Sequence, residues 1–270
     1  MMKMSKSETK AERFTGISQG LPSGGPFVMV TVALRKERKV DYKNQIFNMD
    51  CIAGMTLLPD GCVDMVLTDL PYGMTDCRWD SIIPFDLLWK QLERVTKPDG
   101  AMVFTASQPF TTKLIGSNQK NFRYCWYWVK NMVTGFPFAK FQPLRCVEDI
   151  VVFYRKKPTY NPQGLVATEK KIHTKSRVMK DDCVYDQKTL NKEYETKYTN
   201  WPRQTLTFSC QRGGLHPTQK PVALIRKLIE DSTKPGDLIL DTFGGSSTTA
   251  VASIESGRNL SLIHISEPTR

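Results

Sequence analysis

The sequence predicts an α/β protein built on a doubly wound, mostly parallel sheet. Apolar strand-like runs alternate with segments of helical periodicity, at the spacing of β-α-β units. One run, residues 62–68, is almost continuously apolar, which is typical of a strand buried on both faces. Two strands end at Asp69 and Asp241, and a tight turn follows each. Because ligands of open α/β sheets lie beyond the carboxyl ends of the strands, these two ends predict a site with two occupants, a nucleotide-like cofactor and a planar base.

Local sequence justifies the expected elements. Residues 85–95 should form a helix because apolar residues recur on one side of it, namely Leu87, Leu88, Leu92 and Val95. Pro221 suits the start of a helix over 222–231, where its missing amide proton does no harm. The other expected elements are strands over 45–49, 101–105, 124–129, 150–154 and 238–241, helical segments over 54–58, 109–115 and 247–256, and turns at 98–100 and 235–237.

Composition indicates a folded chain without a membrane span. Of the 270 residues, 40% are hydrophobic, which suffices for a core. No apolar run approaches the roughly 20 residues of a bilayer span, and no signal-peptide pattern opens the chain, so we expect a cytoplasmic protein. The 7 cysteines never occur in a Cys-x-x-Cys spacing and only 3 histidines are present, so reduced thiols and no metal site are expected.

Four segments are expected before a C-terminal tail. Residues 1–43 read as a basic, disordered extension rich in Ser, Gly and Pro, with one candidate strand at 27–34. Two halves of a single domain, 44–154 and 216–259, flank a polar and weakly periodic stretch at 155–215. We interpret this stretch as an inserted recognition region.

The basic balance of the chain favours a polyanionic partner. The formal net charge is +11, and the stretch 155–215 holds 13 Lys and Arg against 6 Asp and Glu, interleaved with tyrosines and a tryptophan. This combination suits phosphate contacts together with base stacking, although a merely solvated charged face is the alternative. The candidate phosphate contacts are Lys156, Lys157, Lys170, Lys171, Lys175 and Arg177.

The segment Asp69-Leu70-Pro71-Tyr72 carries a specific signal. Pro71 fixes the backbone just past the strand, which directs the Asp69 carboxylate and the Leu70 carbonyl outward. These two acceptors can hold both protons of an exocyclic amino group, and the Tyr72 ring offers a surface on which a base can stack. A strand-end aspartate before a proline turn also occurs without any such role.

A glycine-rich turn follows the second aspartate. In Phe243-Gly244-Gly245-Ser246 the glycines let a ligand approach the backbone closely, and the start of the next helix offers free amide protons. The Asp241 carboxylate can accept hydrogen bonds from a cationic amine. Turns of this kind also serve packing alone. The Gly-x-Gly-x-x-Gly fingerprint is not met, which disfavours a nicotinamide cofactor.

Together these motifs resemble the beta-class DNA amino-methyltransferases of phage and bacterial restriction-modification systems. Residues 69–72 resemble the family's Asp-Pro-Pro-Tyr catalytic motif, with Leu70 in place of the first proline, where only the backbone carbonyl is needed. Residues 241–246 resemble its cofactor loop, and His-Pro-Thr-Gln-Lys-Pro at 216–221 resembles the segment before that loop. The similarity spans 44–259, with the catalytic motif first and the cofactor loop last, as in the beta class.

The resemblance implies a Rossmann-like class I methyltransferase fold with an inserted target-recognition region. It implies S-adenosylmethionine as cofactor, double-stranded DNA as partner and a cognate restriction enzyme as a further candidate partner. It assigns catalysis to Asp69, Leu70, Pro71 and Tyr72. It assigns cofactor binding to Asp50, Lys220, Pro221, Asp241, Phe243, Gly244, Gly245 and Ser246.

The implied reaction is methylation of the exocyclic N6 amino group of an adenine that is rotated out of the duplex. Aspartate in the first motif position is similar to adenine enzymes, whereas cytosine enzymes usually carry serine there. The amine attacks directly, with no covalent enzyme intermediate, and alignment of the two reactants supplies much of the acceleration. The alternatives are N4-methylation of cytosine, methylation of RNA or of a protein amide, a catalytically inactive DNA-binding relative, and another α/β nucleotide-binding enzyme.

Three further features bear on the interpretation. Trp126 and Trp128 alternate along a strand, which favours packing. Residues 135–140, Gly-Phe-Pro-Phe-Ala-Lys, resemble a loop beside the target pocket of these enzymes and either touch DNA or form a simple surface loop. Residues 260–270 depart from the family and resemble a translated sequencing adaptor, so we expect a truncated gene with His264 near the place of a missing ribose-binding acid. Residues 260–265 are nevertheless apolar enough to fill the strand position.

Overall fold

The computed structural model describes residues 41–74, 80–173, 195–210 and 219–264. The chain divides into two units, Met1–Lys39 and Val40–Arg270, and all described residues belong to the second. The extension before residue 41, the candidate strand at 27–34, and the side chains of Lys175 and Arg177 therefore lie outside the described residues. No helix within the described ranges is long and apolar enough to cross a membrane.

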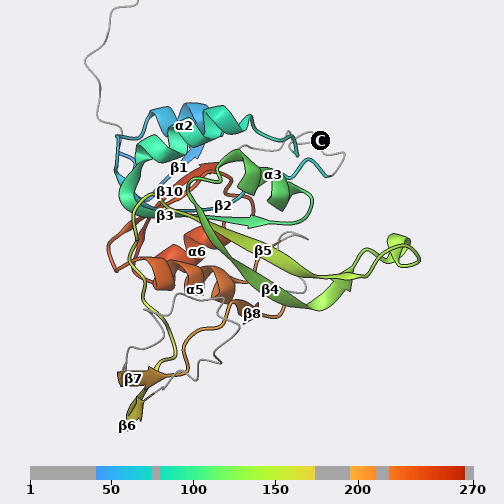
Figure 1. Ribbon diagram of the computed structural model, residues 1–270. Helices are drawn as coiled ribbons and strands as arrows, with labels where there is room; N and C mark the ends of the chain where they lie inside the picture. The colour runs from blue at the N-terminus through green and yellow to red at the C-terminus, as the bar shows by residue number, and fades with distance from the viewer. Residues whose placement is uncertain (1–40, 75–79, 174–194, 211–218, 265–270) are drawn as a thin grey trace, which may run out of the picture. The chain divides into compact units, whose positions relative to one another are not determined.

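An eight-stranded sheet lies at the centre of the domain (Figure 1). Its strands are β1 (Gln45–Asn48), β2 (Val63–Asp69), β3 (Thr96–Ala106), β4 (Phe122–Thr134), β5 (Arg145–Phe153), β8 (Thr205–Thr207), β9 (Leu238–Asp241) and β10 (Asn259–His264). Their order is β1-β10-β9-β2-β3-β5-β4-β8. Every neighbouring pair is parallel except those that involve β5, which runs antiparallel to β3 and β4. The mostly parallel sheet predicted from sequence is confirmed.

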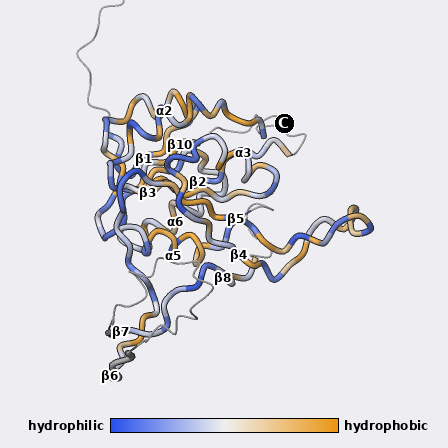
Figure 2. Tube along the Cα trace, viewed as in Figure 1, coloured by the Kyte–Doolittle hydropathy of each residue, from blue (hydrophilic) through white to orange (hydrophobic). Residues whose placement is uncertain are grey.

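Helices cover both faces of this sheet (Figure 1). They are α1 (Cys51–Thr56), α2 (Phe85–Val95), α3 (Phe110–Ser117), α5 (Val222–Ser232) and α6 (Thr248–Glu255), and a short 3-10 helix, η1, spans Phe136–Phe138. Because side chains alternate along a strand, Val66 packs with α1, α2 and α3, whereas Met65 and Leu67 pack with α5 and α6. Figure 2 shows the apolar strands between the helices. The doubly wound arrangement is therefore confirmed.

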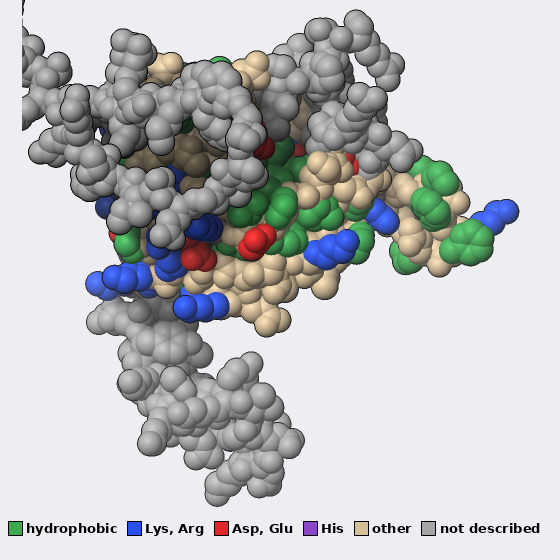
Figure 3. All heavy atoms as spheres, turned by 90° about the horizontal axis from the view of Figure 1, so that it is seen from above, with side chains coloured by type: hydrophobic (Ala, Val, Ile, Leu, Met, Phe, Trp, Pro, Cys, Tyr) green, Lys and Arg blue, Asp and Glu red, His purple; other side chains and the backbone are tan. Residues whose placement is uncertain are grey.

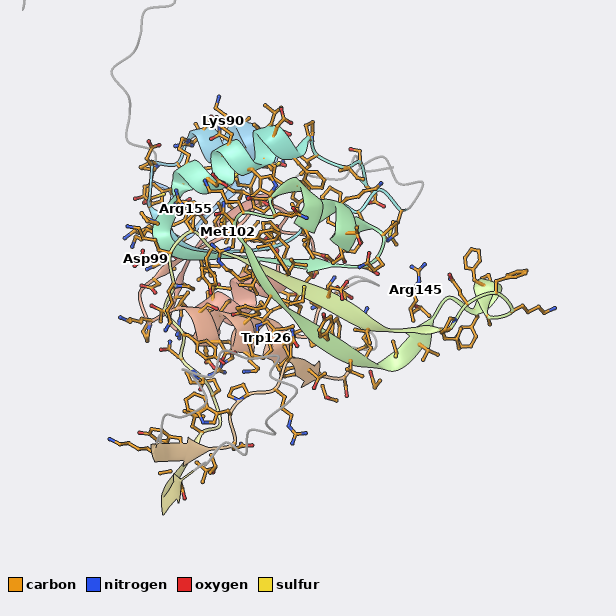
Figure 4. The ribbon with its side chains drawn as sticks, viewed as in Figure 1. Lys90, Asp99, Met102, Trp126, Arg145 and Arg155 are labelled. Atoms are coloured by element: carbon orange, nitrogen blue, oxygen red, sulfur yellow. The ribbon has the colours of Figure 1, made fainter. Side chains whose placement is uncertain are left out.

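The two tryptophans predicted to be packing residues are part of the core. Trp126 and Trp128 are buried on the face of the sheet covered by α5, and Met102 is buried on the other face (Figure 4 labels Trp126 and Met102). The Trp128 indole donates a hydrogen bond to the Phe208 carbonyl at 2.8 Å. The packing interpretation of both tryptophans is confirmed.

Several element boundaries differ from the expectation, and two of the differences have a clear local cause. The turn predicted at 98–100 lies inside β3, because Val63 pairs with Thr96 while Met65 pairs with Ala101, so β3 bulges between these pairs. A side chain at Gly100 would place its Cβ 2.7 Å from the Asp64 carbonyl, which shows why glycine occupies the bulge. Helix α1 begins at Cys51, three residues before the predicted segment, because Asp50 caps it.

Strands also occur where the sequence predicted irregular structure. Within the stretch 155–215, β6 (Val166–His173) and β7 (Glu195–Thr199) form a separate antiparallel pair, and β8 joins the edge of the main sheet beside β4. The strand position expected for residues 260–265 is filled by β10, Asn259–His264, which pairs with both β1 and β9.

Candidate active site

The two strand-end aspartates meet at one edge of the sheet. Strands β2 and β9 are parallel neighbours, with Met65 opposite Ile239 and Val66 opposite Leu240. Asp69 and Asp241 are the last residues of these strands. The expectation that both acids end neighbouring strands is thus confirmed, and the site can be built outward from each of them.

Asp69 is held by three donors from three parts of the chain. Its Oδ1 accepts hydrogen bonds from the Tyr72 hydroxyl, at 2.7 Å, and from the Thr105 hydroxyl. Thr105 lies directly opposite Asp69 on β3, so the sheet register sets this contact. Its Oδ2 accepts a hydrogen bond from Lys220 Nζ at 2.7 Å. The carboxylate therefore has a fixed orientation at the end of β2.

Lys220 connects Asp69 to a second, buried carboxylate. Its Nζ lies 3.0 Å from Glu148 Oε1, on β5, and Lys130 of β4 forms an ion pair with the other oxygen of Glu148. Glu148 is only 6% exposed. The side chains Asp69, Lys220, Glu148 and Lys130 thus alternate in charge, and this chain of ion pairs links β2, the segment before α5, and the β4–β5 hairpin.

Electrostatics keep Asp69 ionised. Burial raises the pKa of Asp69, but the Lys220 ammonium and the hydrogen bonds from Lys220, Thr105 and Tyr72 outweigh it, so the pKa lies below the usual value. Burial and the neighbouring carboxylates raise the pKa of Tyr72 well above its usual value. Burial lowers the pKa of Lys220, but Asp69 and Glu148 more than offset it, so Lys220 stays protonated.

The turn after Asp69 is fixed by packing and by a further acid. Leu70 and Pro71 are buried, and the Tyr72 ring stacks on Phe110 with centroids 5.1 Å apart. The carboxylate of Asp80 accepts hydrogen bonds from the backbone amides of Gly73 and Met74, at 2.8 and 2.9 Å. The segment 69–74 therefore presents Asp69 and Tyr72 on a rigid backbone.

Asp241 lies in an environment that disfavours its charge. It is 3% exposed, and burial raises its pKa to about 6, because hydrogen bonds from Thr249, from the Phe243 amide and from Thr68 offset the burial only in part. The charge of Asp69 contributes to the same rise. Among the described residues, the hydrogen-bond donors recorded for this carboxylate are all neutral.

The glycine-rich turn after Asp241 lies close to the neighbouring strand β10. A Cβ on Gly244 would lie 2.3 Å from Leu262 Cδ2 of β10, so a side chain cannot fit there. Gly245 has a φ of +37° and is exposed, while Ser246 shares a hydrogen bond with Thr248 at 3.0 Å. Gly245 is therefore the exposed residue of this turn, whereas Phe243 and Ser246 are half-buried.

Other residues predicted for the site have local roles in the structure. Asp50 follows β1 and caps α1, with Oδ1 accepting from the Ala53 amide at 3.0 Å. Pro221 is buried at the start of α5. Lys156 and Lys157 are exposed, whereas Lys170 and Lys171 belong to β6 and their side chains are outside the described set.

Sequence reasoning missed four residues that hold the site together, namely Thr105, Lys130, Glu148 and Asp80. Glu148 and Asp149 directly precede an apolar run, which is a recognisable signal, but Lys220, which connects Glu148 to Asp69, lies 72 positions further along the chain. Thr105 has no local signature, because only its register opposite Asp69 gives it a role.

The fold and the two acidic strand ends are those of a class I methyltransferase. The model of the DNA methylase family matches residues 63–268, and the chain belongs to this family. A curated relative, the type II methyltransferase M.HinfI of Haemophilus influenzae, is 25% identical over 263 residues. That match covers 84% of this chain and 66% of the relative, so the chain spans just under two thirds of its length.

Solved structures share the fold. The M1.HpyAVI–SAM complex is 22% identical and superposes with a TM-score of 0.54, covering 83% of this chain and 94% of that chain. The PvuII DNA methyltransferase, described as cytosine-N4-specific, is 16% identical with a TM-score of 0.59, covering 83% and 82%. The predicted fold class is confirmed.

Proposed function

We propose that this chain is an S-adenosylmethionine-dependent DNA methyltransferase that acts on the N6 amino group of adenine. The observation that carries the proposal is the pairing of β2 with β9, which places Asp69 and Asp241 at one edge of the sheet. Membership of the DNA methylase family and a net charge of +11 support DNA as the substrate.

The residues around Asp241 fit the proposed cofactor. A buried carboxylate whose recorded donors are neutral is costly unless a cationic group reaches it, and an α-amino group would supply that charge. Gly245 leaves room for a ligand beside the backbone, because it is exposed and the nearest atom to its Cβ position is the Phe243 carbonyl oxygen at 3.8 Å. When bound, S-adenosylmethionine supplies an electrophilic sulfonium methyl group.

Asp69 is suited to orient the target amine. An exocyclic amine is a poor nucleophile, since its lone pair is delocalised into the base. Hydrogen bonds from the amine to the Asp69 carboxylate and the Leu70 carbonyl favour a tetrahedral nitrogen and localise the lone pair. Tyr72, whose ring stacks on Phe110, is the aromatic side chain on which we expect the base to stack.

The same network determines where the proton goes. After the new N–C bond forms, the nitrogen carries one surplus proton. Because the pKa of Asp69 is held low by Lys220, Asp69 is a weak base, and we assign this proton to water. Asp69 thus acts as a hydrogen-bond acceptor throughout the reaction.

N4-methylation of cytosine is the second candidate. The PvuII enzyme, which shares the fold, is cytosine-N4-specific. Two acceptors at the end of β2 suit either exocyclic amine. The aspartate at position 69 favours adenine through its resemblance to adenine enzymes.

The test is nucleoside mass spectrometry. Plasmid DNA is incubated with the protein and S-adenosylmethionine, then digested and assayed for N6-methyldeoxyadenosine and N4-methyldeoxycytidine. Asp69→Ala should abolish methyl transfer and leave cofactor binding largely intact. Asp60→Ala removes an exposed carboxylate paired with Arg94 and is the matched control. Wild-type methylation by Asp69→Ala would refute the assignment.

A further inference from the structure

The tip of the β4–β5 hairpin exposes an unusual set of aromatic side chains. Phe136 is 66% exposed, Phe138 56% and Phe141 85%. We call residues 132–147 the hairpin tip; its other exposed large apolar residues are Met132, Val133 and Val147. Figure 3 shows hydrophobic side chains gathered there together with Lys and Arg side chains. Clusters of exposed apolar side chains of this kind mark interaction sites.

The backbone of the hairpin tip is ordered by its own hydrogen bonds. The amides of Phe138 and Ala139 donate to the carbonyls of Gly135 and Phe136, at 2.9 and 3.1 Å. The Phe141 amide donates to the Phe138 carbonyl at 2.9 Å. The phenyl rings are therefore presented on a series of turns, and they stay exposed although the turns hold the backbone in place.

The hairpin extends beyond the edge of the sheet at which Asp69 lies. The last pair between β3 and β5 joins Ala106 to Asp149, so Arg145–Glu148 continue past the end of β3 (Figure 4 labels Arg145 on the hairpin). The base of the hairpin contributes Glu148 to the ion pair with Lys220, which bonds Asp69. The hairpin tip is thus connected to the catalytic carboxylate through two ion pairs.

The charge of the hairpin tip matches a polyanion. Residues 132–147 include Lys140 and Arg145 and contain no aspartate or glutamate. Both cations are exposed. Aromatic rings can stack on bases and the neighbouring cations can contact phosphates, so this set of side chains is complementary to DNA.

We propose that the hairpin tip enters the DNA base stack beside the target base, with its phenyl rings filling the gap that the rotated base leaves. Lys140 and Arg145 then contact the flanking phosphates. This inference rests on the proposed function, because it requires a base to leave the stack. It also assigns a role to the segment 135–140, which the sequence left between DNA contact and surface loop.

The test compares binding to two fluorescein-labelled duplexes of about 40 base pairs and mixed sequence, one intact and one with a single abasic site. The abasic site provides the gap in advance. The wild-type protein should bind the abasic duplex more tightly by about 5- to 150-fold, the equivalent of one base–aromatic stack. The triple variant Phe136→Ala/Phe138→Ala/Phe141→Ala should bind both duplexes equally, since the rings are exposed and their loss leaves the core intact.

Two controls separate stacking from charge and from general exposure. Ile254→Ala removes an apolar side chain that is 72% exposed on α6 and should keep the preference for the abasic duplex. Lys140→Ala/Arg145→Ala should keep the preference but lower the slope of log Kd against log salt concentration by about 2.

Two results would overturn the inference: a triple variant that keeps the preference, or a wild-type protein that shows none. Loss of self-association or of binding to anionic lipid vesicles in the triple variant, with DNA binding unchanged, would also overturn it. The proposed function is judged separately, by nucleoside mass spectrometry. If the protein methylates DNA but shows no preference for the abasic duplex, the proposed function stands and the insertion of the hairpin tip into the base stack is rejected.

Discussion

Replacing Lys220 by methionine is expected to make methyl transfer sensitive to acid. In the wild-type protein the Lys220 ammonium, together with hydrogen bonds from Lys220, Thr105 and Tyr72, outweighs burial and holds the pKa of Asp69 below its usual value, so Asp69 is ionised at neutral pH. Methionine has a similar length and no charge. Burial then acts unopposed by the ammonium and raises the pKa of Asp69, so the protonated, inactive form becomes more populated as the pH falls.

The size of the effect follows from the geometry. Lys220 Nζ donates a charge-assisted hydrogen bond of 2.7 Å to Asp69, a class of bond that contributes about 1.5–3 kcal/mol. The Asp69 side chain is 38% exposed, so solvent screening favours the lower end of that range. Because one pKa unit corresponds to about 1.4 kcal/mol, we expect the pKa of Asp69 to rise by about one unit and the acid limb of kcat/KM that belongs to Asp69 to move to higher pH by the same amount.

The assay is tritium transfer from labelled S-adenosylmethionine to plasmid DNA between pH 5.5 and 9. The other groups that interact with Asp69 are Tyr72, Thr105 and Asp241, and they are unchanged in the variant. Asp241, with a pKa of about 6, should give the same acid limb in both proteins and serves as an internal reference. Lys220→Arg keeps the charge and should keep the wild-type profile.

Lys227→Met is the matched control for this experiment. Lys227 forms a 2.7 Å ion pair with Asp231 within α5, away from Asp69, so its loss should lower stability without moving the pH profile. If Lys220→Met reduced activity by one factor at every pH, Lys220 would have only a structural role and the electrostatic argument would be wrong.

Three further predictions concern the cofactor side and the ion-pair chain. Asp241→Asn should stabilise the ligand-free protein, because a folded-state pKa above the unfolded value makes the ionised carboxylate destabilising. The gain in the free energy of unfolding should appear as the pH rises through about 6 and reach about 3 kcal/mol, which raises the Tm. Calorimetry should show weaker S-adenosylmethionine binding, and an unchanged Tm at pH 8 would contradict this prediction. Glu148→Gln removes the carboxylate paired with Lys130 and leaves Lys220 with Asp69 alone, so it should cost about 3 kcal/mol, or roughly 6–12 °C in Tm. Glu230→Gln removes an exposed i,i+4 pair with Arg226 and should cost at most about 0.5 kcal/mol. Equal shifts in thermal unfolding would exclude a buried ion-pair chain. Gly244→Ala should weaken cofactor binding because its Cβ would lie 2.3 Å from Leu262 Cδ2, and Leu262→Ala should restore it in the double variant; an undiminished affinity of the single variant would show that the turn tolerates a side chain.

The sequence alone predicted those elements whose structure depends on residues close together in the chain. The apolar run of β2, the helical periodicity of α2 and the aspartate-and-turn endings of β2 and β9 are readable because burial and backbone geometry act over a few residues. Parallel strands bring their carboxyl ends to one edge, so the meeting of Asp69 and Asp241 also followed from the pattern, and the structure confirms it.

Only the tertiary structure decided which side chains surround those acids. The register of β3 against β2 places Thr105 on Asp69, and the hairpin and the segment before α5 bring Glu148 and Lys220 to it from positions 79 and 151 residues further along the chain. The sequence predicted strands over 124–129 and 150–154, whereas β4 and β5 run on to form the exposed hairpin. Ion pairs and strand extensions of this kind depend on which surfaces face each other after folding, and no short stretch of sequence contains that information.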